Sequence, residues 1–250
     1  MSGHSHWATI KHKKGAIDAK RGKLWSKLSR AIIIAARHGG GDPTMNLKLR
    51  YAIDKAREVS MPKDNIERAI KRGTGEVEGL TFEEITYEGF GPGGVAIMVD
   101  VLTDNRNRTN GEVRKIFERA GVNMGSDGCV GYLFERKGLF SINAIGVDED
   151  TLMTIALDAG ADDLKQTGGH FEITCDPHEF SKVQDALQKN NITPQVAEIT
   201  QLPKTQVDAD AETARKAVRL VEALDDHDDV QNVYSNLNIP DEVMAELAKG

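Results

Sequence analysis

The spacing of apolar residues changes near Gly75, and this change limits the possible folds more than any other feature of the sequence. Before that point, apolar side chains recur every three or four residues, which is the pattern of helices with one buried face. After it, short runs typical of strands alternate with further helical patterns. The sequence therefore predicts a helical region followed by an α+β region.

Three helices are expected before Gly75. The first covers residues 16–37, where the apolar side chains share one arc of about 100°. These side chains are Ile17, Leu24, Trp25, Leu28, Ile32 and Ala35. The stretch HGGG then ends this helix, and we expect Asp42 to cap a second helix with Pro43 in its first turn. A third helix is predicted over residues 62–73.

Strands are expected at residues 82–87 and 95–102, joined by the glycine-rich turn EGFGPGG. A helix should follow at residues 110–120, because Thr109 and Glu112 have the spacing of a capping box. The other expected strands are 130–134, 139–143, 163–166, 171–175, 195–200 and 230–235, and the other expected helices are 149–158, 178–188 and 211–224.

Residues 138–200 follow the order βαββαβ, which is the split ferredoxin-like unit. The helix and strand of the tail would return to complete the sheet that begins at residue 82. We therefore predict an α+β fold with an N-terminal helical domain and two ferredoxin-like α+β domains. The expected domains are residues 1–77, residues 78–136 plus 203–250, and an inserted domain at residues 137–202.

Charged residues are divided along nearly the same boundary. Residues 1–72 contain 17 basic and 6 acidic side chains, whereas the remaining residues contain 15 basic and 33 acidic ones. The helical region therefore carries a charge of +11 within a chain whose net charge is -7. A basic module on an acidic body is expected when one part binds a polyanion. The plainer alternative is a helical domain whose lysines lie on a solvated face.

The opening segment contains the first candidate contacts to nucleic acid. Lysine supplies a point charge to a phosphate, arginine can bind two phosphate oxygens, and an indole can stack on a base. The link HGGG is looser than the turn of a helix-turn-helix motif, so contact by charge without base reading is expected. The candidates are His4, His6, Trp7, Lys11, His12, Lys13, Lys14, Lys20, Arg21, Lys23, Lys27 and Arg30.

Arg106 and Arg108 form a second candidate, because they directly precede the helix expected at residues 110–120. The dipole at a helix N-terminus disfavours cations, so two arginines there favour a bound anion such as phosphate. The alternative is that they pair with acidic side chains of the same domain, for example Glu84 or Glu88.

No enzyme, metal site or cofactor is predicted. The three histidines of the opening segment could bind a transition metal, but no nearby carboxylate completes a site. The stretch DDHDD at residues 225–229 could hold a divalent cation, although a solvated turn is favoured. An enzyme is disfavoured because no serine, cysteine or carboxylate pair has recognisable partners. The enzymatic alternative is a metal-dependent nuclease that uses the histidines and residues 225–229. The longest aliphatic run, AIIIAA, is too short to span a membrane, so a cytoplasmic protein is expected.

Three stretches together resemble the YebC/PmpR family of regulatory proteins: GHSHWATIKHKKGAIDAKRGKLWSKLSR, YEGFGPGGVAIMVDVLTDNRNRT and DDVQNVYSNL. The resemblance covers nearly the whole chain. It implies a three-domain cytoplasmic protein that binds DNA and regulates transcription. Relatives are also associated with translation, so a factor that binds ribosomal RNA on the ribosome is the alternative. A third class is an adaptor whose basic face pairs with an acidic protein, and the acidic domains could also contact a protein partner.

Overall fold

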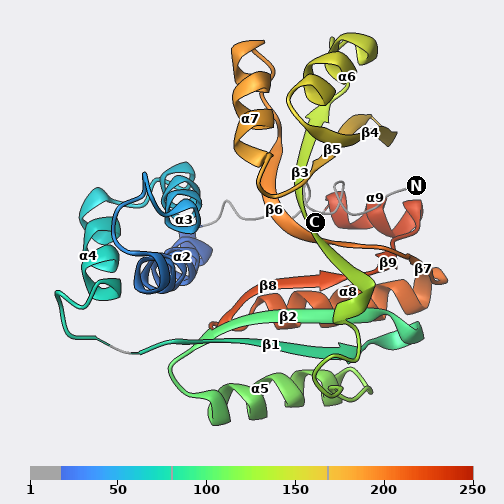
Figure 1. Ribbon diagram of the computed structural model, residues 1–250. Helices are drawn as coiled ribbons and strands as arrows, with labels where there is room; N and C mark the ends of the chain where they lie inside the picture. Colours follow the sequence, from blue (N-terminus) through green and yellow to red (C-terminus); the bar gives the residue numbers. More distant parts are fainter. Residues whose placement is uncertain (1–17, 80, 168, 250) are drawn as a thin grey trace.

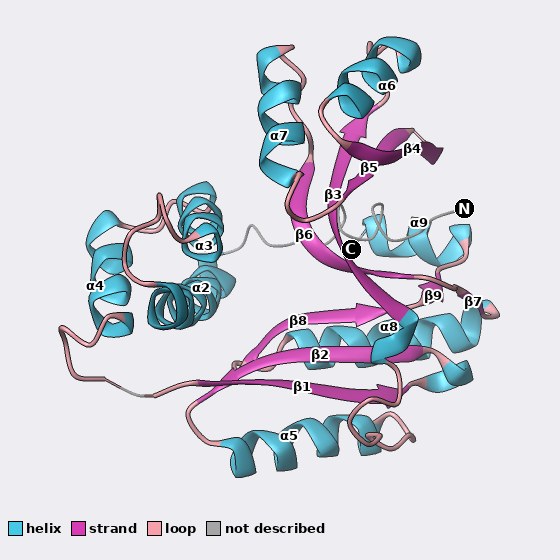
Figure 2. Cartoon of the chain, in the orientation of Figure 1, coloured by secondary structure: helices cyan, strands magenta, loops and turns pink. Residues whose placement is uncertain are grey.

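The computed structural model describes residues 18–79, 81–167 and 169–249. A helical region lies beside two further regions, each of which combines helices with an antiparallel sheet (Figure 1). The α+β fold class is therefore confirmed. In the cartoon coloured by secondary structure, strands occur only beyond the helical region (Figure 2). No helix in the described part of the chain is long and apolar enough to cross a membrane.

The helical region contains α2 (Asp18–Gly39), α3 (Leu47–Glu58) and α4 (Lys63–Gly73), close to the three predicted helices. Its core joins apolar residues of all three helices, among them Ile32, Leu49 and Ile66. The end of α4 crosses α2 so closely that a Cβ on Gly73 would lie 2.5 Å from the carbonyl oxygen of Ile33. A side chain at this position would therefore force the two helices apart.

The cap of α3 differs from the prediction. Asn46, not Asp42, caps the helix by accepting a hydrogen bond from the amide of Leu49. The Asn46 side chain is buried, and it also donates to the carbonyls of Ala35 and Gly40, which fixes it between α2 and α3. Asp42 instead accepts from the amide and hydroxyl of Thr44. Asp42 thus stabilises a turn before the helix, and Pro43 lies in that turn.

The second region is built on a three-stranded antiparallel sheet in the order β1-β2-β8. Its strands are β1 (Glu83–Phe90), β2 (Ala96–Thr103) and β8 (Val230–Ser235), and its helices are α5 (Arg106–Arg119), α8 (Ala211–Asp225) and α9 (Asp241–Lys249). Buried side chains of α5, α8 and α9 form one core with those of the sheet. Two short parallel strands, β7 (Val207–Asp208) and β9 (Leu237–Asn238), pair nearby.

The third region contains a four-stranded antiparallel sheet in the order β4-β5-β3-β6. Its strands are β3 (Phe134–Asn143), β4 (Ala161–Thr167), β5 (His170–Cys175) and β6 (Val196–Pro203), and its helices are α6 (Glu149–Asp158) and α7 (Phe180–Lys189). Both helices contribute to a core with Phe140 and Ile173 of the sheet. Figure 1 shows this region above the second region, with β3 and β6 running between them.

Several elements differ from the predicted ones. Residues predicted as a strand at 130–134 instead contain a short 3-10 turn, η2 (Gly131–Leu133), after which β3 begins at Phe134. The glycine-rich turn contains another, η1 (Pro92–Gly94), in which Gly93 and Gly94 have φ angles of 74° and 75°. These positive angles explain why glycine is used there. Helix α9 and the pair β7–β9 were not predicted.

Candidate nucleic-acid interface

Five of the predicted contact residues have described side chains: Lys23, Lys27, Arg30, Arg106 and Arg108. The others lie outside the described residues or side chains, so the structure does not place them. They are His4, His6, Trp7, Lys11, His12, Lys13, Lys14, Lys20 and Arg21.

Three cations of α2 point to the turn between α8 and β8, which we call the acidic turn (residues 225–229). Lys27 Nζ donates to the carbonyl oxygen of Asp225 at 2.6 Å, and Lys23 Nζ donates to that of Asp226. Both carbonyls belong to the C-terminal end of α8, where backbone oxygens lack partners within the helix and the helix dipole is negative. Two lysines of α2 thus neutralise the end of α8.

The same contact includes carboxylates. Lys23 Nζ lies 3.2 Å from Asp228 Oδ1, and Arg30 lies 3.2 Å from Asp229 Oδ1 while also donating to the carbonyl of Asp228. The side chain of Asp228 is 73% exposed, but that of Asp229 is only 4% exposed. The contact therefore extends from solvent into the core of the second region.

Asp229 is the buried centre of this arrangement. Its Oδ2 accepts hydrogen bonds from Thr103, Thr109 and Arg108 at distances of 3.1, 2.7 and 2.8 Å. Burial alone would raise the pKa of Asp229, but hydrogen bonds from Thr109 and Arg108, together with the charge of Arg30, lower it below its ordinary value. The carboxylate is therefore held in its charged form between two arginines.

Arg108 lies in the first turn of α5, because the helix begins at Arg106 and is capped by Asn105, whose side chain accepts from the amide of Arg108. The predicted capping box of Thr109 and Glu112 is therefore wrong. Thr109 is fully buried, and its hydroxyl reaches Asp229 across the region. Thr109 thus serves the buried network around Asp229 and not the helix cap.

Arg108 pairs with acidic side chains of its own region, as the alternative to anion binding expected, but its partners are not Glu84 or Glu88. Its guanidinium contacts Asp104 at 2.9 Å and Asp229 at 2.8 Å, and hydrogen bonds to these carboxylates raise its pKa. Glu84 lies instead 3.6 Å from His38, and Glu88 accepts from backbone amides at residues 128–131. Arg106 is exposed and has no ion-pair partner among the described residues.

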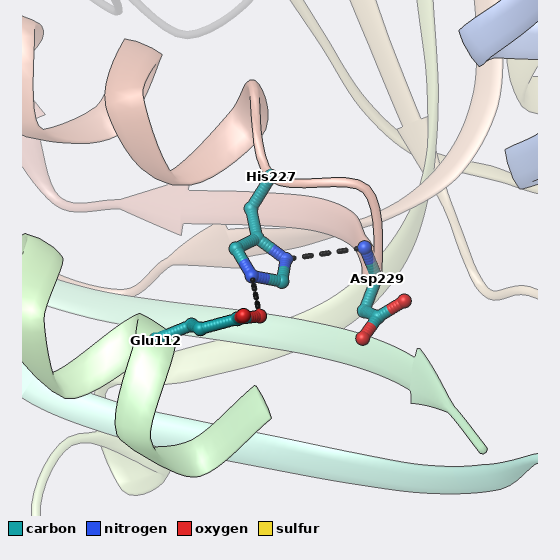
Figure 3. A group of neighbouring side chains, drawn as sticks. All are labelled: Glu112, His227 and Asp229. Carbon is teal, nitrogen blue, oxygen red and sulfur yellow. Dashed lines mark hydrogen bonds and ion pairs between the residues drawn. The ribbon is translucent and has the colours of Figure 1, made fainter. Parts of the chain in front are cut away.

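His227 of the acidic turn lies close to Glu112 and Asp229, and these three side chains offer oxygen and nitrogen atoms within 4.8 Å of one another (Figure 3). Their bonding does not favour a cation. His227 Nδ1 accepts from the Asp229 amide, so Nε2 carries the hydrogen that faces Glu112 at 2.9 Å. Both oxygens of Asp229 already contact arginines. The group is accounted for as a hydrogen-bond network.

A groove of about 740 Å³ lies beside the contact, between α2 and α5. Lys23 and Arg30 line one side, and Lys115 and Arg119 of α5 line the other. Within the described part of the chain, neither Lys115 nor Arg119 has an ion-pair partner, and both are exposed. These two cations were not among the predicted contacts. The spacing of four residues on α5, which places both on one face, was the signal available in the sequence.

Comparisons with known proteins assign the chain to a family. Residues 5–76 match the family model described as "TACO1/YebC protein N-terminal domain". Residues 82–237 match the model described as "TACO1/YebC second and third domain". A probable transcriptional regulatory protein of Desulforapulum autotrophicum is 55% identical, over 97% of this chain and 98% of that protein. Another, from Dictyoglomus turgidum, is 53% identical over 99% of this chain and all of its own length.

A solved structure has the same fold. The crystal structure of a conserved hypothetical protein from Aquifex aeolicus superposes with a TM-score of 0.83 and 50% identity, and the match covers 94% of this chain and 97% of that one. Fold and matches together define an α+β protein with a basic N-terminal helical region. The chain belongs to the TACO1/YebC family, which confirms the resemblance seen in the sequence. The relatives form a non-enzymatic family, so the expectation that this chain is not an enzyme is also confirmed.

Proposed function

We propose that this protein is a nucleic-acid-binding regulator of gene expression, and that it binds DNA to control transcription in the cytoplasm. The observation that carries the proposal is the charge of +11 within residues 1–72 of a chain with a net charge of -7. Basic residues concentrated in one module match the phosphate backbone of a nucleic acid. The names of the relatives, probable transcriptional regulatory proteins, support DNA as the partner.

The helical region has exposed cations besides those in contact with the acidic turn. Lys48 of α3 and Arg68, Lys71 and Arg72 of α4 are all exposed, and none has an ion-pair partner in the described part of the chain. In Figure 1, α4 lies on the side of the helical region that faces away from both sheets. We infer that these residues join the lysines of the opening segment in contacting phosphates.

The test is a titration of labelled full-length protein with duplex DNA at several salt concentrations. If six to eight cations meet phosphates, affinity should fall by roughly three to five orders of magnitude between 50 and 200 mM salt. The double variant Lys13→Glu, Lys14→Glu should bind at least about tenfold more weakly, because two attractive contacts become repulsive. A matched control, Lys165→Glu with Lys182→Glu, makes the same charge change on exposed lysines of the third region and should bind almost normally.

The same titration against intact ribosomes separates the two nucleic-acid alternatives. Tighter binding to ribosomes than to DNA, lost in the Lys13/Lys14 variant, would identify a translation factor that contacts ribosomal RNA. Binding to neither at 50 mM salt would overturn the proposal and favour a protein adaptor. Incubation of DNA with the protein and Mg²⁺ or Mn²⁺ should leave the DNA intact, because no nuclease activity is proposed.

We also propose that the third region is an inserted ferredoxin-like domain. Strands β1 and β2 precede it, yet β8, which follows it, pairs with β2 in one sheet. Within residues 134–203 the elements follow the order βαββαβ, and the two outer strands in sequence, β3 and β6, are neighbours in the sheet. The proposed boundaries remain 1–77, 78–136 plus 203–250, and 137–202. A protein partner for these acidic domains is part of the proposal.

A further inference from the structure

The acidic turn occupies cations that the proposed function assigns to nucleic acid. We propose that this turn is an autoinhibitory contact: it binds Lys23, Lys27 and Arg30 of α2 in place of phosphates, and a bound nucleic acid displaces it. The inference rests on the proposed nucleic-acid binding and adds how that same site is regulated. It follows from the contacts between α2 and residues 225–229.

The acidic turn offers the cations the same chemistry as a phosphate backbone. Lys23 contacts a carbonyl oxygen and a carboxylate oxygen, and Arg30 does the same. Lys27 contacts the carbonyl of Asp225 at the negative end of the α8 dipole. Charged or partly charged oxygens spaced along a chain are also what a nucleic-acid strand presents to lysine and arginine.

The acidic turn and a phosphate compete for the same side of Lys23 and Arg30. Lys23 is only 35% exposed and Arg30 only 22% exposed, because the second region covers them. Their charged groups already have oxygen partners on the side that faces the turn. A phosphate oxygen that takes the side facing the turn must replace one of those partners, so nucleic acid and the acidic turn compete for that side of both cations.

The displaceable part of the turn is distinct from the fixed part. Asp229 belongs to the core of the second region, where Thr103, Thr109 and Arg108 hold it. Asp226 and Asp228 are exposed, and the groove between α2 and α5 gives solvent access to both. Exchange of the turn for a phosphate therefore breaks the surface contacts and the Arg30–Asp229 ion pair, and it leaves the hydrogen bonds of Asp229 to Thr103, Thr109 and Arg108 in place.

Neutralising the exposed aspartates tests the competition in the full-length protein. The variant Asp226→Asn, Asp228→Asn removes the Lys23–Asp228 ion pair and two negative charges beside the cations. It should bind duplex DNA about fivefold more tightly than the wild type at 150 mM salt, which corresponds to the upper end of one exposed ion pair. The control Asp158→Asn, Asp185→Asn makes the same change in net charge on exposed residues of α6 and α7, and should bind like the wild type.

The outcomes distinguish this inference from the proposed function. Tighter binding by the turn variant alone supports autoinhibition, and DNA binding by that variant at 150 mM salt, where the wild type binds only at lower salt, supports it more strongly. Equal binding by the turn variant and its control overturns autoinhibition while leaving the proposed function intact. Absence of binding by all three proteins, to DNA and to ribosomes, at 50 mM salt overturns both.

A second measurement follows the contact itself. Lys23 Nζ and Asp228 Oδ1 are 3.2 Å apart, so a carbodiimide should join them by an amide bond that mass spectrometry detects. The yield of this cross-link should fall in proportion to the bound fraction as DNA is added, and the pre-formed cross-linked protein should bind DNA weakly. A yield that is unchanged at saturating DNA contradicts displacement of the turn.

Discussion

The helical region meets its two neighbours through contacts of different chemistry. Toward the second region, Lys23, Lys27 and Arg30 bind carbonyl and carboxylate oxygens of the acidic turn. Toward the third region, the ring of Tyr51 on α3 packs edge-on against Phe180 of α7, with centroids 5.3 Å apart and an interplanar angle of 87°. The first contact joins cations to backbone carbonyls and carboxylates, whereas the second is organised around an aromatic pair.

Hydrogen bonds and one ion pair surround that aromatic pair. The hydroxyl of Tyr51 and the guanidinium of Arg50 each lie 3.0 Å from Ser181 Oγ, and Lys55 pairs with Glu198 at 3.1 Å. Salt and polyanions weaken exposed ionic contacts but have little effect on packed rings. The helical region is therefore held by one contact that a nucleic acid can replace and by another that it cannot. This difference would allow α2 to part from the acidic turn while α3 stays docked.

Removal of the buried Asp229 carboxylate should cause the largest loss of stability at the contact between α2 and the acidic turn. Asp229→Ala leaves Arg108, Thr103 and Thr109 without their shared acceptor, and it removes one partner of Arg30. We expect the free energy of unfolding to fall by about 3 kcal/mol, the lower end for breaking a buried ion pair. A denaturant titration monitored by circular dichroism measures this free energy. The variant Asp228→Ala at the exposed end of the same turn is the control, and an equally large loss there would contradict the assigned roles.

Acid should act on the same carboxylate. The folded-state pKa of Asp229 lies below its ordinary value of 3.8, so its charged form is favoured by folding. This contribution is complete above pH 3.8 and is lost as the pH falls through the lowered folded-state pKa. The wild type should therefore lose stability steeply below about pH 4, and Asp229→Asn, compared over the same pH range, should show a flatter profile. Parallel profiles for the two proteins would show that Asp229 does not control acid stability.

A smaller loss is expected when the aromatic contact is broken. Tyr51→Ala removes the edge-on pair with Phe180 and the hydroxyl contact with Ser181, for an expected cost of about 2 kcal/mol. Tyr51→Phe keeps the ring and should cost about 1 kcal/mol or less. The fluorescence of Trp25, whose indole donates to the carbonyl of Val59 inside the helical region, reports the transition. Both losses should be the same at 0.1 and 1 M salt, unlike those on the ionic side.

Local patterns predicted most elements of the fold. The period of the apolar residues gave α2, α3 and α4 within a few residues, and the predicted helix at 149–158 coincides with α6. The misplaced starts had tertiary causes. Asn46 caps α3 because the carbonyls of Ala35 and Gly40 fix its amide, and Thr109 is used by Asp229 instead of a cap. Helix propensity does not register such partners, which come from other parts of the chain.

Less of the candidate site could be predicted, for the same reason. The sequence indicated basic candidate residues within α2 and an acidic stretch at residues 225–229, and it assigned each group to solvent or to an outside ligand. The structure brings the two together across about 200 residues of chain, as the contact of Lys27 with Asp225 shows. Opposite charge alone cannot establish such a pair, because many acidic residues of the body could serve. Which acidic residues α2 meets depends on the tertiary fold, in which β8 pairs with β2 and the end of α8 lies beside α2.

The smallest effects are expected at two partly exposed ion pairs, one on each side. Asp228→Asn and Lys55→Met should each change the free energy of unfolding by less than about 1 kcal/mol, because ion pairs that water reaches gain little. The two pairs should differ in how strongly salt separates their charged groups. Carbodiimide cross-linking of Lys23 to Asp228 should lose yield between 0.1 and 1 M salt, since screening shortens the reach of charge to about 3 Å. Cross-linking of Lys55 to Glu198 should lose less, because the neighbouring Tyr51–Phe180 pair keeps these groups together. Equal losses would show that the aromatic contact does not hold α3 when the charges are screened.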